Sequence, residues 1–76
     1  MDEQTLALRG EHITLDALLK AAGLAASGGD AKALIAGGAV TVNGQVETRR
    51  GRKLRAGDRV ALGGKGVRIQ GPAATP

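Results

Sequence analysis

The chain has 76 residues, enough for one small domain, and its composition excludes several kinds of function. Phe, Tyr, Trp and Cys are absent and there is a single His, so disulfides, thiolate zinc sites and a thiol nucleophile are excluded. We expect no metal and no cofactor. Because no apolar run approaches the roughly 20 residues of a membrane span, and residues 1–4 are acidic, we expect a cytoplasmic protein without a membrane partner.

The net charge of +4 is unevenly distributed along the chain. Residues 1–48 carry three basic and six acidic side chains, whereas residues 49–76 carry eight basic side chains and one acidic one. Such asymmetry between two halves indicates a polyanionic partner, and nucleic acid is the first candidate.

We expect one domain over residues 5–70, with flexible ends at residues 1–4 and 71–76. Its first element, residues 5–8, has leucines two apart, as a half-buried edge strand would. Such an edge could pair with a second copy, although we expect a monomer.

Two short helices follow. The first is indicated by apolar residues at helical spacing, which are Leu15, Leu18, Leu19 and Ala22. Thr14 occupies the expected N-cap and Gly23 the end of this helix. The second helix is indicated by Ser27 followed by Asp30, a spacing close to a capping box. Both helices are about two turns long, so they must pack on each other and on a sheet to be stable.

After Gly38 the apolar period changes from 3.6 to 2, which indicates strands. Asn43-Gly44 predicts a two-residue hairpin turn. The predicted strands are residues 40–42, 45–48, 60–62 and 67–69. The predicted fold is therefore an α+β domain, with two short helices packed on a small, mostly antiparallel sheet of about four to five short strands.

Residues 49–55, called the basic segment below, form the strongest functional signal. The segment contains no acid and has five basic side chains, which are Arg49, Arg50, Arg52, Lys53 and Arg55. The planar fork of arginine pairs bidentately with phosphate, so the segment favours a nucleic-acid surface. The alternative is a solvated charged loop, but an otherwise acidic chain has concentrated its positive charge here.

The remaining candidates are weaker. Lys32 lies beside the apolar stripe of the second helix and could reach a ligand near its start, or could simply remain in water. Residues 63–66 lack the spacing of a phosphate-binding loop and predict a hairpin turn. No catalytic constellation is visible, so we expect no enzyme. Without Phe, Tyr or Trp, only arginine planes remain for stacking on unpaired bases, which favours the phosphate backbone of structured or duplex RNA or of DNA over unpaired strands.

Particular residues at matching spacing make the chain similar to the S-four RNA-binding domain, a family named after a small-subunit ribosomal protein. The resemblance covers roughly residues 14–60. Within that family the chain resembles the YbcJ-like subgroup of small stand-alone bacterial proteins. The residues that carry the resemblance are Thr14 to Lys20, Ser27, Asp30 to Lys32, Leu34, Ile35, Gly38, Val40, Val42, Asn43, Gly44, Ala56 to Asp58 and Val60.

The resemblance implies an RNA-binding protein with the fold called the alpha-L motif. It places Lys32, the basic segment and Lys20 at positions that are often basic in the family. The chain departs from the family pattern at Gly28, where an arginine is frequent, and it lacks other basic residues along its helices. The basic segment would then carry most of the affinity, or binding would need a partner such as the ribosome.

The leading hypothesis is a non-enzymatic protein that grips structured RNA through phosphate contacts, with ribosomal or transfer RNA as the expected ligand and ribosomal proteins as further candidate partners. The expected contact residues are Lys20, Lys32, Arg49, Arg50, Arg52, Lys53 and Arg55. The alternative is a protein-interaction module that docks on an acidic partner in a ribosome or translation complex.

Overall fold

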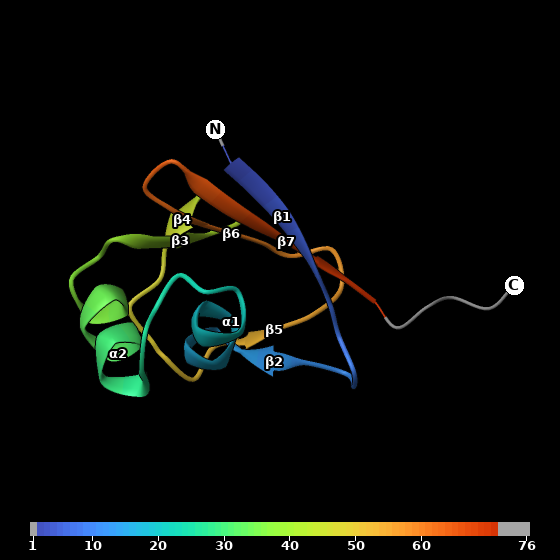
Figure 1. Ribbon diagram of the computed structural model, residues 1–76, viewed down its shortest axis with the longest axis horizontal. Coiled ribbons are helices and arrows are strands. Elements are labelled where there is room, and N and C mark those ends of the chain that lie inside the picture. The colour runs from blue at the N-terminus through green and yellow to red at the C-terminus, as the bar shows by residue number, and fades with distance from the viewer. Residues whose placement is uncertain (1, 72–76) are drawn as a thin grey trace, which may run out of the picture.

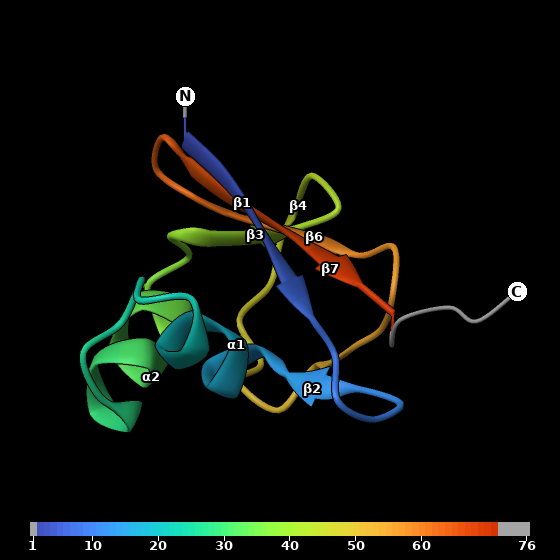
Figure 2. The same cartoon turned by 45° about the vertical axis from the view of Figure 1, so that its right-hand side comes forward.

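The computed structural model describes residues 2–71, and these form two layers with the core between them (Figures 1 and 2). One layer is a five-stranded sheet in the order β1-β7-β6-β3-β4. β1 runs parallel to β7, and the other neighbouring strands are antiparallel. The strands of this sheet are β1 (Asp2–Ala7), β3 (Val40–Val42), β4 (Gln45–Val46), β6 (Arg59–Leu62) and β7 (Lys65–Gln70).

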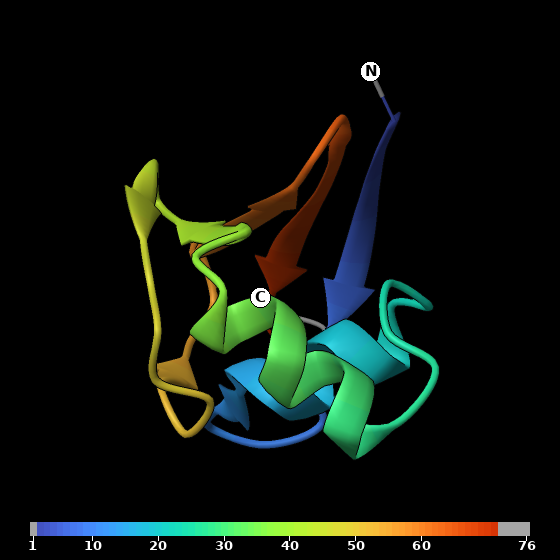
Figure 3. The same cartoon turned by 90° about the vertical axis from the view of Figure 1, so that its left-hand side faces the viewer.

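The second layer contains helix α1 (Leu15–Ala21) and helix α2 (Gly28–Ala36), which pack against each other. A two-stranded antiparallel sheet of β2 (Ile13–Thr14) and β5 (Lys53–Leu54) lies beside α1 (Figure 1). Figure 3 shows α2 in front, with the chain from β4 to β5 running down from the five-stranded sheet at the side of the helix pair. The predicted α+β fold is confirmed.

The second helix begins as the sequence predicts. The Oγ of Ser27 accepts a hydrogen bond from the amide of Asp30 at 3.1 Å, and the Asp30 carboxylate accepts one from the Ala26 amide at 3.0 Å. These two bonds satisfy amides that would otherwise lack partners before the first helical turn. The start of α2 is therefore fixed by short-range interactions.

The hairpin between β3 and β4 also follows the prediction. Asn43 and Gly44 both have positive φ, at 53° and 85°, and Val42 pairs with Gln45 across the turn. Asn and Gly are the residues that adopt this left-handed region with least strain, which is why the pair specifies a two-residue turn. The turn sets the register of the whole hairpin, so Thr41 pairs with Val46.

Several boundaries differ from the sequence-based expectation. β1 begins at Asp2 rather than residue 5, because β7 also begins early and pairs with it along its length. β4 ends at Val46 rather than at residue 48, and the basic segment contains the short strand β5, which is not among the predicted strands. The predicted tail covers residues 71–76, of which 72–76 lie outside the described residues. In the described part of the chain, no helix is long and apolar enough to cross a membrane.

The core is aliphatic throughout, as the composition requires. Its most deeply buried members come from both helices and from the inner face of the sheet, and they are Leu15, Leu18, Leu19, Ile35, Val40, Leu54, Val60, Val67 and Ile69. Alternate residues of β6 and β7 point inward, and so each strand contributes one face to the core.

Two valines provide a matched test of this core. Val60 is fully buried in β6, whereas Val46 in β4 is 61% exposed. Val60→Ala should lower the free energy of unfolding by about 2 kcal/mol, because it removes buried methyl groups and leaves a cavity. Val46→Ala should change it by less than about 0.5 kcal/mol. Urea denaturation measures both, and equal losses would contradict the described packing.

Candidate nucleic-acid interface

The basic segment is attached to the start of α1 by its backbone. The Leu15 amide donates to the Arg52 carbonyl at 2.9 Å, and the Asp16 amide donates to the Arg50 carbonyl at 3.1 Å. The first amides of a helix have no partner within the helix, so these two carbonyls satisfy them. The Thr14 hydroxyl, which was predicted to cap α1, instead donates to the Asp16 carboxylate at 2.7 Å. A loop from a distant part of the sequence therefore caps α1.

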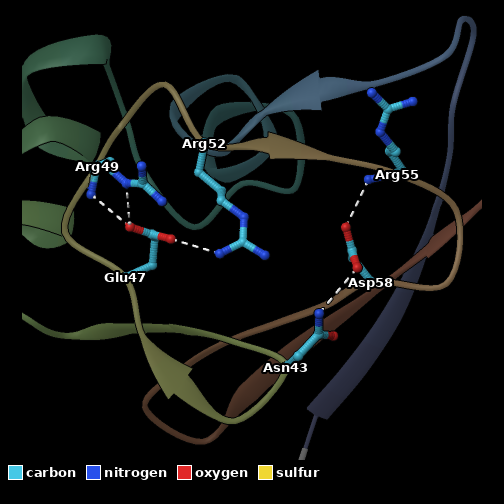
Figure 4. Close-up of polar contacts among 6 residues, drawn as sticks. All are labelled: Asn43, Glu47, Arg49, Arg52, Arg55 and Asp58. Carbon is cyan, nitrogen blue, oxygen red and sulfur yellow. Dashed lines mark hydrogen bonds and ion pairs between the residues drawn. The ribbon is translucent and has the colours of Figure 1, made fainter.

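Glu47 lies two residues before the start of the segment, with Thr48 between them, and holds two of the segment's arginines (Figure 4). Its Oε2 accepts hydrogen bonds from the Arg49 backbone amide at 3.1 Å and from Arg49 Nε at 3.3 Å. Its Oε1 accepts one from Arg52 Nη1 at 2.7 Å. These interactions, with the Arg52 bond the strongest, lower the pKa of Glu47 from 4.5 to about 2. Glu47 is therefore an ionised carboxylate enclosed by cations.

The far end of the segment is fixed by Asp58 (Figure 4). One carboxylate oxygen of Asp58 accepts from the Arg55 amide at 2.8 Å, and the other accepts from the Asn43 side chain at 3.0 Å. Partial burial alone would raise the pKa of Asp58, but these bonds and the nearby guanidinium groups of Arg52 and Arg55 hold it below its usual range. The β3–β4 turn and the end of the segment are thus joined through one carboxylate.

A third carboxylate lies near the middle of the segment. The bond from the Thr14 hydroxyl is the main cause that lowers the pKa of Asp16, and the charge of Arg50 contributes a smaller part. The segment itself contains no acid, but Glu47, Asp16 and Asp58 from neighbouring or distant parts of the chain approach it in space and offset part of its charge.

The predicted contact residues remain largely open to solvent. Arg52 is half-buried, and the exposed ones are Lys20, Lys32, Arg49, Arg50, Lys53 and Arg55. The five from the basic segment follow one another along a single stretch of chain that leads into β5 and is tied to the start of α1. Lys20 lies in the last turn of α1 and Lys32 in α2, so the helix pair places them outside that stretch.

The sequence did not identify Glu47, although its signal was available in the hairpin register. Because Val40 and Val42 point inward, Thr41 and its partner Val46 point outward. The next residue, Glu47, then lies opposite Val40 and donates its amide to the Val40 carbonyl at 3.0 Å. An acid at an inward position next to five cations predicts an internal ion pair.

Among the described residues, other charged side chains form ion pairs but no cluster of metal ligands. Within residues 2–71, no three His, Asp or Glu side chains gather as a metal site requires. The other ion pairs in that range join Glu3 of β1 to Arg59 and Arg68 on the outer face of the sheet, at 3.0 and 3.8 Å.

Comparisons with known proteins agree with this architecture. The family model of the S4 domain matches residues 6–70. The protein YbcJ of Escherichia coli strain K12, named for a proposed RNA-binding role, is 45% identical over 58 residues, which are 76% of this chain and 83% of YbcJ. YbcJ of Shigella flexneri matches to the same extent. The solution structure of E. coli YbcJ, described as revealing an alpha-L motif involved in RNA binding, aligns with this chain at 42% identity and a TM-score of 0.68. The alignment covers 87% of this chain and 85% of the YbcJ chain.

The environment of Glu47 predicts how stability depends on pH. Because its pKa is lower in the folded chain than in the unfolded chain, Glu47 stabilises the fold above about pH 4.5, and this contribution is lost as the pH falls towards about 2. Thermal melts between pH 7 and pH 2.5 should therefore show a smaller acid-induced fall in Tm for Glu47→Gln than for the unchanged protein. The exposed Glu11→Gln is the control and should keep the original profile. Parallel profiles for all three proteins would contradict the role of Glu47.

Proposed function

The chain belongs to the S4 domain family, and on this premise we propose that it is a non-enzymatic RNA-binding protein that holds structured RNA through the basic segment. The observation that supports this most is the fixed, exposed arrangement of the segment. Its backbone is tied to α1, to Glu47 and to Asp58, while four of its five cations are exposed. Cations on a fixed backbone lose less conformational entropy when they bind phosphates.

The composition favours the phosphate backbone as the feature that is recognised. Without Phe, Tyr or Trp, the chain has only the imidazole of His12 and the planes of its arginines on which an unpaired base could stack. Guanidinium and ammonium groups instead bind phosphate oxygens regardless of sequence. The ligand is therefore a folded RNA whose shape presents phosphates to the segment, with Lys20 and Lys32 contacting neighbouring parts of the same RNA.

The family resemblance also supports a cellular setting. We extend the proposal to a monomer that acts in the cytoplasm on ribosomal or transfer RNA, since the family takes its name from a ribosomal protein. Crosslinking in cells, followed by sequencing of the bound RNA, tests this part. Enrichment of ribosomal or transfer RNA is the expected result, and enrichment of messenger RNA alone would contradict it.

Salt titration tests the phosphate contacts. If about four to six cations engage phosphates, a plot of log K against log[salt] for a structured RNA hairpin should have a slope of about −3 to −5. Fluorescence anisotropy at several salt concentrations measures it. A slope near zero would contradict the mechanism, and recovery of one acidic protein by pull-down, without RNA affinity, would support the protein-interaction alternative.

A matched pair of double variants locates the surface. Arg50→Ala with Lys53→Ala removes two cations from the basic segment, whereas Lys65→Ala with Arg68→Ala removes the same two residue types from β7. The first pair should weaken binding by about tenfold or more and reduce the salt slope by about 2, because two phosphate contacts are lost. The second pair should have a much smaller effect. Equal losses would place the contact surface elsewhere.

A further inference from the structure

Glu47 is an unusual residue to find beside a surface that is proposed to bind a polyanion. It is only 7% exposed, although it is charged, and it is bonded to the two arginines that flank it in space. Its negative charge reduces the positive potential of the segment. If charge alone determined RNA affinity, Glu47 would be a disadvantage at this position.

The geometry of the two arginines indicates what Glu47 contributes. A guanidinium group has five N–H donors, and each arginine uses one of its side-chain donors on the carboxylate. The Arg49 side chain remains 78% exposed and that of Arg52 36% exposed. Each arginine therefore keeps donors that are open to solvent while the carboxylate fixes its orientation. Figure 4 shows the two side chains converging on Glu47 from opposite sides.

We propose that Glu47, Arg49 and Arg52 form a pre-organised phosphate clamp, in which Glu47 is a positioning residue and the open edges of the two arginines bind a phosphodiester group. This inference rests on the proposed function. The carboxylate holds both side chains in one conformation before RNA arrives, so their ordering does not oppose binding. A long side chain that must become ordered on binding lowers the affinity by about twofold to tenfold, and pre-ordering removes that loss.

For Glu47→Gln, the clamp predicts a change in RNA affinity opposite to the change that net charge alone predicts. Glu47→Gln raises the formal net charge from +4 to +5 and releases two arginines, so simple electrostatics predicts tighter RNA binding. The clamp predicts weaker binding, by about threefold or more, because Gln cannot hold two guanidinium groups as an ionised carboxylate does. The Kd for a structured RNA hairpin at fixed salt and neutral pH decides between the two.

Two control variants separate the orientation of the arginines from changes in net charge and in stability. Glu11→Gln makes the same charge change at an exposed position and should bind as tightly as the unchanged protein or more tightly. Val42→Ala removes buried methyl groups from β3 and should lower Tm without changing the Kd. All proteins are compared at a temperature at which their melting curves show them folded. Equal or tighter binding by Glu47→Gln would overturn the clamp.

A second variant covers the case in which Glu47→Gln does not fold. Arg52→Lys keeps the net charge and an ion pair with Glu47, but it lacks the second edge of the guanidinium fork. Its affinity should fall by about threefold or more, and unchanged affinity would contradict the clamp. Side-chain NMR gives a direct readout, because the Arg52 Nη signals should be sharp and separate in the unchanged protein and averaged in Glu47→Gln.

The same measurements distinguish failure of the clamp from failure of the proposed function. If the unchanged protein binds RNA with the expected salt slope and Glu47→Gln binds at least as well, the function stands and the clamp is wrong. If the unchanged protein shows no RNA affinity at any salt concentration, both are wrong.

Discussion

Two hydrogen bonds from the first turn of α1 hold the basic segment, which we propose as the RNA-binding surface, against the helix pair. The amides of Leu15 and Asp16 would lack partners in an isolated helix, and the carbonyls of Arg50 and Arg52 satisfy them. The same bonds fix the middle of the basic segment on the rigid core, because α1 contributes several fully buried leucines. A loop without regular structure along most of its length thereby acquires a defined position.

Placing five cations in seven residues creates repulsion that the fold must offset. Three carboxylates from other parts of the chain do so, and each has a lowered pKa in the folded protein. Glu47 and Asp58 approach the two ends of the segment, and Asp16 lies near its middle. The acids bond backbone amides and inner edges of the arginines, which leaves cationic edges facing the solvent. The carboxylates thus offset part of the repulsion while exposed positive groups remain on the solvent side of the segment.

Much of this structure could be predicted from local sequence patterns. Ser27 and Asp30 identified the start of α2, and Asn43-Gly44 identified the hairpin, because these signals depend on neighbouring residues. The capping of α1 by a distant loop and the pairing of β2 with β5 depend on tertiary contacts between residues about 40 positions apart, which no local period reveals. The sequence shows the run of cations that we propose as the interface, but the acids that bond to it could be identified only from the strand register and the tertiary structure.

The central proposal is that RNA lies against the basic segment rather than on the open face of the sheet. Amide NMR spectra recorded while a structured RNA hairpin is added test this most directly. The account predicts that the largest shift changes fall in residues 49–55 and in the first turn of α1, with β1 and β7 nearly unchanged. Large changes along β1 and β7, with the basic segment unaffected, would contradict it.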